Sequence, residues 1–286
     1  MTQELPWSRY VAIGDSFTEG VGDPEPRSPG GLRGWADRVA EVMAQQAPGF
    51  AYANLAIRGR LIDAINEEQI EPALALRPDL ITYCAGGNDV IRPGSDPDAV
   101  TEKVELAARQ LRRSGATVVL FTAVDVGFSP VFRYIRGKVA IYNENVRAIA
   151  QRHGCLVADQ WALTELRDAR LWSADRLHMN PLGHHLVAGM VLDTLGVKHG
   201  LQPEEPAPME PLGWRRARAE DLVWARQHLL PWVMRRIRHQ SSGDFVSAKR
   251  PQAAPLKTGH AEPEQRSFAH GSADDGGAGP NAAATD

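Results

Sequence analysis

The sequence contains only two cysteines, Cys84 and Cys155, and no apolar run that reaches the ~18 residues of a membrane helix. Each cysteine falls in a segment expected to be a buried strand, where a reduced thiol packs as a small hydrophobic group; a disulfide and a nucleophilic thiol are the alternatives. The N-terminus has neither the basic nor the apolar stretch of a secretion signal. These absences together predict a cytoplasmic protein.

A strong excess of charge of either sign is also missing. Thirty-two Lys and Arg residues face 35 Asp and Glu residues, which gives a formal net charge of −3. This balance does not indicate a nucleic acid or a strongly acidic ligand as a partner. Hydrophobic residues make up 43% of the 286 positions, which allows a normal core in one large domain or two small ones.

Strand-like and helix-like segments alternate from residue 9 to residue 196. The expected strands are 10–13, 50–56, 79–84, 117–121 and 155–158, and the expected helices are 32–46, 61–76, 97–113, 133–153 and 181–195. This alternation predicts a five-stranded parallel sheet with helices on both faces, in one domain over residues 8–196. Ligands of such sheets bind at the carboxyl ends of the strands.

The pattern changes after Gly196. Residues 197–212 are rich in proline and glutamate and are predicted to be a linker. Residues 213–250 hold nine Lys and Arg against three Asp and Glu, and predict a basic amphipathic helical extension with its helix at 220–240 and a kink at Pro231. Residues 251–286 have almost no large apolar side chain and are predicted to be a disordered tail.

The helix at 220–240 allows two interpretations. Its apolar stripe could pack on the main domain, with its arginines in solvent. Alternatively, its Trp, Leu and Arg residues suit a lid or a weak contact with an anionic membrane surface.

The first segment with chemical potential is Gly14-Asp15-Ser16, directly after the first expected strand. A serine at a strand-to-helix turn is exposed at the edge of the sheet, and its own N–H can point toward an attacked carbonyl oxygen. Taken alone, Ser16 could equally be a helix N-cap, since serine is favoured there.

Two further segments follow the second and third strands. Gly59 permits close approach of the backbone to a ligand, although a loop glycine alone is ordinarily a turn residue. Asn88, within Gly86-Gly87-Asn88-Asp89, offers an amide donor of the kind that stabilises a developing oxyanion. An Asx-turn or a helix cap would explain Asn88 and Asp89 without catalysis.

The last segment is Asp175-Arg176-Leu177-His178, shortly before the final helix of the domain. A carboxylate and an imidazole three residues apart can face each other, so that the carboxylate fixes the tautomer and the other ring nitrogen takes a serine proton. A solvated surface pair is the simpler alternative. His184 and His185 lie nearby and suggest zinc, but no H-E-x-x-H spacing occurs and one of them should face solvent, so no metal is expected.

In combination, these segments resemble the SGNH (GDSL) hydrolase family, which is named for a Ser, a Gly, an Asn and a His in separate blocks. Ser16 matches the nucleophile. Gly59 and Asn88 match the two oxyanion donors, which the N–H of Ser16 would join. Asp175 and His178 match the Asp-x-x-His block. The resemblance covers residues 8–196 and implies a flavodoxin-like three-layer α/β/α fold.

The resemblance also implies cleavage of carboxylic esters or thioesters of a small or lipid-like molecule, through an acyl-Ser16 intermediate and without a cofactor. Phe17 stands where lipase-like members often have leucine, which resembles the esterase branch more than the secreted lipases. Thr18 departs from the G-x-S-x-G elbow of α/β-hydrolases. Acyl transfer and carbohydrate O-deacetylation would use the same residues, and a non-catalytic binding module is the third interpretation. The sequence does not indicate an oligomeric state.

Overall fold

The computed structural model describes residues 5–208, 218, 221–231, 234 and 242–256. A six-stranded sheet forms its centre, in the order β5-β4-β3-β1-β2-β6. Five strands are parallel: β1 (Arg9–Gly14), β2 (Ala51–Asn54), β3 (Leu80–Cys84), β4 (Thr117–Phe121) and β5 (Leu156–Ala158). The predicted α/β fold with a parallel sheet is therefore confirmed.

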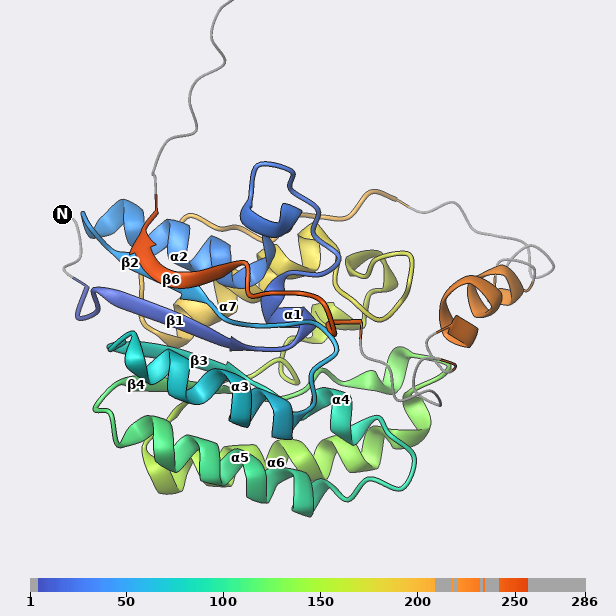
Figure 1. Ribbon diagram of the computed structural model, residues 1–286. Coiled ribbons are helices and arrows are strands. Elements are labelled where there is room, and N and C mark those ends of the chain that lie inside the picture. Colours follow the sequence, from blue (N-terminus) through green and yellow to red (C-terminus); the bar gives the residue numbers. More distant parts are fainter. Residues whose placement is uncertain (1–4, 209–217, 219–220, 232–233, 235–241, 257–286) are drawn as a thin grey trace, which may run out of the picture.

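Helices cover both faces of this sheet and make the three layers visible in Figure 1. On one face lie α1 (Ser16–Glu19), α2 (Gly34–Gln46) and α7 (Pro181–Thr194); on the other lie α3 (Ile62–Ala75), α4 (Gly87–Val90), α5 (Pro97–Arg112) and α6 (Arg136–His153). Short helical turns occur at Pro29–Gly31, Val126–Phe128, Arg133–Ile135, Thr164–Arg167 and Ala169–Leu171.

Successive side chains of β1 point to opposite faces of the sheet, and helices cover both faces, so the strand is buried on both sides. Tyr10 and Ala12 enter the core under α2 and α7, whereas Val11 and Ile13 enter the core under α3, α5 and α6. This explains why the strand is an unbroken apolar run. The sheet has β2 on one side of β1 and β3 on the other. The carboxyl ends of β1 and β3 therefore form the topological switch point, where ligands of such sheets bind.

A sixth strand, β6 (Arg250–Pro255), corrects the prediction of five strands and of a disordered tail beginning at residue 251. It pairs antiparallel with β2, with a register shift between Tyr52 and Asn54. Two prolines and little apolar surface hid it from a pattern search, but an edge strand tolerates proline because half of its N–H groups need no partner. Residues 257–286 of the predicted tail lie outside the described residues.

The predicted linker is described through residue 208, and the helical extension is described at residues 218, 221–231, 234 and 242–250. Residues 221–231 are helical, with a π-helical turn at Ala225–Leu229. Pro231 lies two residues after the end of this turn, beyond Leu230. A proline lacks an N–H and clashes with the carbonyl four residues before it, which accounts for the widened turn. None of the helices within the described ranges combines the length and apolarity that a membrane-spanning segment requires.

Candidate active site

The structure brings Ser16, His178 and Asp175 into one hydrogen-bonded chain. The Oγ of Ser16 lies 3.0 Å from Nε2 of His178, and Nδ1 of His178 lies 2.6 Å from Oδ2 of Asp175. Ser16 begins α1 directly beyond β1, while the other two residues stand on the loop before α7. Residues separated by about 160 positions in the sequence therefore meet at the carboxyl edge of the sheet.

Hydrogen bonding determines which nitrogen of His178 carries the proton. Burial alone raises the pKa of Asp175, but bonds from His178 and Ser173 and the positive charge that His178 can carry outweigh it and hold this pKa well below its usual range. An ionised carboxylate only accepts, so Nδ1 of His178 carries the proton. Nε2 is then the acceptor that faces the hydroxyl of Ser16.

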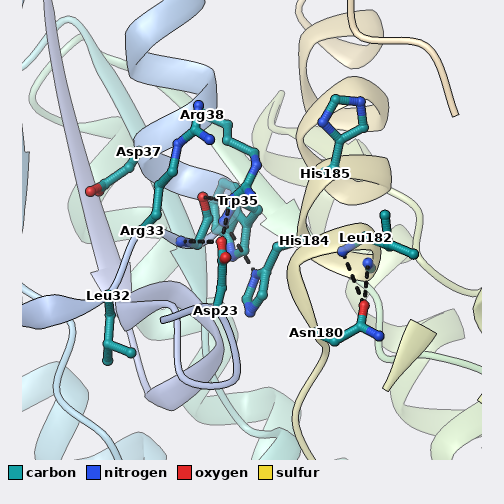
Figure 2. A network of polar contacts seen from close by, with 12 residues as sticks. Asp23, Leu32, Arg33, Trp35, Asp37, Arg38, Asn180, Leu182, His184 and His185 are labelled. Atoms are coloured by element: carbon teal, nitrogen blue, oxygen red, sulfur yellow. Dashed lines mark hydrogen bonds and ion pairs between the residues drawn. The ribbon is translucent and has the colours of Figure 1, made fainter. Parts of the chain in front are cut away.

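The loop around Asp175 folds around this carboxylate. Oδ1 of Asp175 accepts from the N–H groups of Leu177 and His178, at 2.9 and 3.0 Å, and from Oγ of Ser173 at 2.7 Å. Beyond it, Oδ1 of Asn180 accepts from the N–H groups of Leu182 and Gly183 and so begins α7 (Figure 2). His178 is thus held between an Asp-centred turn and a capped helix.

Asn88 lies between the loops that carry Ser16 and Gly59. Its Nδ2 donates to Oδ2 of Asp15 at 2.9 Å and to the carbonyl of Arg60 at 3.3 Å. Asp15 precedes Ser16, and Arg60 follows Gly59, so the three predicted oxyanion donors stand within one residue of a shared hydrogen-bond network. Ser16 opens a helix, where the first N–H groups have no acceptor inside the helix.

Two buried carboxylates, those of Asp15 and Glu19, support both loops, and their supporting role could not be read from the motif around Ser16. Burial raises the pKa of Asp15 to about 6, against hydrogen bonds from Phe17 and Asn88 that lower it. Glu19 is buried and accepts from the backbone N–H of Arg58 at 2.7 Å while pairing with its guanidinium. The Glu19–Arg58 pair fixes the Gly59 loop to α1.

Gly22 is another site residue that sequence reasoning missed. Its φ is +99°, and a Cβ atom there would stand 2.0 Å from the carbonyl oxygen of Met179, next to His178. Only glycine allows this close approach of the loop after α1 to the histidine loop. The sequence shows a glycine at this position, but only the fold shows that it faces the carbonyl of Met179.

A cavity of about 1160 Å³, counted with its open mouth, begins at Ser16 and His178. Asn88 and Arg176 also line it, whereas Gly59 is not among the described residues on its wall. Most of the wall is apolar and includes Ile91, Val126, Phe128, Phe132, Val139 and Trp172. The residues 122–135 that supply much of this wall follow β4 at the same edge of the sheet.

The three neighbouring histidines have separate environments. His184 is fully buried: its Nδ1 accepts from the N–H of Trp35 and its Nε2 donates to the carbonyl of Val21, both at 3.2 Å. Figure 2 shows the rings of His184 and His185 pointing in different directions from α7. Within the described parts of the chain, no three His, Cys, Asp or Glu side chains are grouped so as to hold a metal ion.

A buried ion pair of Asp23 with Arg38 lies beside His184, and Oδ2 of Asp23 also accepts from the N–H of Gly34 at 2.8 Å (Figure 2). Phe17, next to the serine, stacks on the His184 ring with centroids 5.6 Å apart. Burial lowers the pKa of His184 to about 4, although the bond to Val21 and the charge of Asp23 oppose this. The neutral ring therefore ties the loop after α1 to α7.

This pKa predicts a loss of stability in acid. The unfolded histidine takes up a proton near pH 6.5, whereas the folded one resists until about pH 4, so stability falls as pH drops through this window. Between pH 6.5 and 5 the contribution is about 2 kcal/mol. Gln can also accept from Trp35 and donate to Val21, but it has no ring that stacks on Phe17 and none that takes up a proton. We therefore expect His184→Gln to be less stable than wild type at pH 7.5, by a margin that shrinks by this amount at pH 5.

Urea unfolding of both proteins at the two pH values measures this margin. Asp15, whose pKa is raised, acts in the opposite sense but is present in both proteins and cancels in the difference. A margin that stays constant with pH would contradict the assignment to His184.

Comparison with known proteins identifies the family to which this fold belongs. Residues 12–186 match the GDSL-like Lipase/Acylhydrolase family. A search of curated proteins finds no match. Solved structures with a similar fold include LAE5, an alpha/beta hydrolase from the metagenome of Lake Arreo, Spain, at 20% identity and a TM-score of 0.56, over 68% of this chain and 98% of that one.

Two other solved structures match a similar share of this chain. The lipase/acylhydrolase from Enterococcus faecalis is 19% identical, with a TM-score of 0.54 over 69% of this chain and 98% of that one. A catalytic mutant of Axe2, an acetylxylan esterase from Geobacillus stearothermophilus, is 19% identical, with a TM-score of 0.55 over 69% and 98%. With most of the domain inside the family match, the chain belongs to the GDSL-like lipase/acylhydrolase family and is a hydrolase of ester bonds.

Proposed function

We propose that the protein hydrolyses carboxylic esters through an acyl-Ser16 intermediate. The observation that carries this proposal is the continuous chain from Ser16 Oγ to His178 Nε2, 3.0 Å, and from His178 Nδ1 to Asp175 Oδ2, 2.6 Å, at the mouth of a cavity. A hydroxyl, a base and an orienting carboxylate in this order form the arrangement that activates a serine.

In the proposed reaction, Oγ of Ser16 attacks the carbonyl carbon of the ester while its proton passes to Nε2 of His178. The tetrahedral intermediate collapses when His178 returns this proton to the leaving alcohol. His178 then takes a proton from a water molecule whose oxygen attacks the acyl carbon. When this second tetrahedral intermediate collapses, His178 returns the proton to Oγ of Ser16 and the acid leaves. Asp175 stays ionised and stabilises the imidazolium in both halves. A thioester would follow the same steps with a thiol as the leaving group.

The oxyanion would be held by the N–H groups of Ser16 and Gly59 and by the amide of Asn88. Both Nδ2 hydrogens of Asn88 have an acceptor, and the bond to Arg60 is the longer at 3.3 Å against 2.9 Å for Asp15. We infer that the Arg60 bond is the one released when an oxyanion forms, because it is the weaker of the two.

The cavity supports an aliphatic acyl group as the preferred substrate class. Its wall beyond Ser16 is mostly apolar, and each buried CH₂ group contributes about 0.8 kcal/mol to binding. A second candidate is removal of acetyl groups from a carbohydrate. Phe128 and Trp172 line the cavity with their ring centroids 5.4 Å apart, and the Trp172 Nε1 donates to the carbonyl of Leu166, so this aromatic pair is fixed as a surface on which a sugar ring could stack.

A panel of p-nitrophenyl esters from acetate to dodecanoate tests both candidates, with acetylated xylooligosaccharide beside it. We expect wild-type protein to prefer chains of four to eight carbons over acetate by about tenfold or more in kcat/KM, because the two to six added CH₂ groups bury apolar surface. Preference for acetate, with release of acetate from the oligosaccharide, would support deacetylation instead. Full activity of a Ser16→Ala variant would contradict both.

A further inference from the structure

Residues 221–231, named here the C-terminal helical segment, contact the loop between Asp175 and His178. The indole Nε1 of Trp224 donates to the main-chain carbonyl of Asp175 at 3.0 Å, and Nη1 of Arg176 lies 2.6 Å from Oδ1 of Asp221. The segment is the orange helix in Figure 1. It reaches the loop from 45 and 49 positions further along the chain, outside the family match.

The loop has a strained turn at the point of contact. Arg176 has a φ of +56°, in the left-handed region that is unfavourable for a residue with a Cβ atom. Its N–H donates to the carbonyl of Ser173 at 2.9 Å, and its guanidinium lies 4.9 Å from the centroid of the Trp224 ring. Such a conformation persists only where its surroundings hold it.

Trp224 carries more of this restraint than Asp221. The Asp221–Arg176 ion pair is open to solvent, with side chains 59% and 43% exposed, and such pairs contribute little. The indole N–H instead meets a partly buried carbonyl, and the same ring stacks on the guanidinium. Among the described residues, Arg176 lines the cavity and Trp224 does not, so Trp224 acts through the loop.

We propose that Trp224 is a positioning residue for the Asp175–His178 pair, which makes the C-terminal helical segment a working part of the active site. This inference rests on the proposed function. When Trp224 no longer holds the carbonyl of Asp175, the carboxylate drifts from His178, and the charge that forms on the imidazole in the transition state is less stabilised. Substrate binding does not use that charge, so kcat falls while KM stays.

Three variants of the full chain test the proposal. Trp224→Phe keeps an aromatic ring over Arg176 but removes the N–H, and Trp224→Ala removes both. Trp7→Phe is the matched control, because Nε1 of Trp7 also donates over 3.0 Å, to Oγ1 of Thr117 at the opposite end of the sheet. We expect kcat for p-nitrophenyl butyrate to fall about threefold to fivefold in Trp224→Phe and about tenfold or more in Trp224→Ala, with KM within twofold of wild type.

The rate at which a fluorophosphonate labels Ser16 should fall by the same factors, because labelling also needs the activated hydroxyl. Trp7→Phe should lower Tm without changing kcat or the labelling rate. The proposal is overturned if both Trp224 variants keep kcat and the labelling rate within twofold of wild type, whatever their Tm, or if KM alone rises. Ser16→Ala measured in parallel separates this outcome from a failure of the proposed function, which would show as retained activity in that variant.

Discussion

Replacing His178 by alanine is expected to lower kcat for a carboxylic ester by roughly 10⁵–10⁶, and Ser16→Ala should do the same. Nε2 of His178 lies 3.0 Å from Oγ, and among the described residues no other side chain is hydrogen-bonded to Oγ to take the serine proton. Asp175→Asn should cost about 10⁴, because an amide at 2.6 Å from Nδ1 can favour the wrong tautomer of His178. Initial rates on p-nitrophenyl butyrate measure all three.

Non-additivity gives the sharper result. Serine and histidine act in one step, so the Ser16→Ala, His178→Ala double variant should be no slower than either single variant. His185→Ala is the matched control on α7: Nε2 of His185 bonds to the carbonyl of Gln202 at 2.9 Å, away from the serine, and its rate should equal that of wild type. If His178→Ala retained a tenth of wild-type kcat with a native circular dichroism spectrum, the proposed triad would be abandoned.

Replacing Lys249 by methionine is expected to give the largest loss of stability, about 3–5 kcal/mol at pH 8. Nζ of Lys249 lies 3.0 Å from Oδ1 of Asp37, with the two side chains 3% and 1% exposed, and it also donates to the carbonyls of Leu32 and Arg33. Methionine fills a similar space but leaves the buried Asp37 carboxylate with only the more distant Arg250, whose Nε lies 3.6 Å from Oδ2, as a cation. Thermal unfolding should show Tm lower by roughly 10 °C.

The solvent-exposed pair of Lys103 and Asp63 provides the comparison. Its Nζ–Oδ2 distance is 2.7 Å, but its side chains are 43% and 61% exposed, so Lys103→Met should cost under about 1 kcal/mol. Burial raises the pKa of Asp37 although Lys249 lowers it, so removing Lys249 should raise this pKa further, and the Lys249→Met protein should recover part of its loss as the pH falls. Adding Asp37→Asn should recover part of it at every pH. Equal losses of stability in Lys249→Met and Lys103→Met would show that the buried ion pair contributes no more to stability than the exposed one.

The fold and the candidate catalytic residues could be predicted because both leave local patterns in the sequence. Val11 and Ile13 alternate with Tyr10 and Ala12 in a strand buried on both faces, which is why an apolar run followed by Gly14 indicated a parallel strand. Polar residues placed just beyond such strands must meet at one edge of the sheet. Local order along the chain therefore predicted that Ser16 and Asn88 would lie together.

Single contacts between distant segments that lie outside the recognised motifs were not predicted. Trp224 appeared only as part of an amphipathic helix, and the carbonyl it binds is that of Asp175, 49 positions earlier. Lys249 was counted among nine basic residues of an extension, although its partner Asp37 is buried in α2. Neither contact leaves a periodic signal, because each is one side chain meeting one group across the fold.

The pairing of β6 with β2 also sets an order of assembly. About 200 residues separate Asn54 from Pro255, and at roughly 5–20 residues per second the ribosome needs on the order of 10–40 s to make them. During that time the outer edge of β2 has no neighbour, and an open strand edge can pair with another chain. Synthesis that stops before Lys249 would leave that edge bare and Asp37 without Lys249 and Arg250, so the hydrolase reaches its finished sheet only after Pro255 has been made.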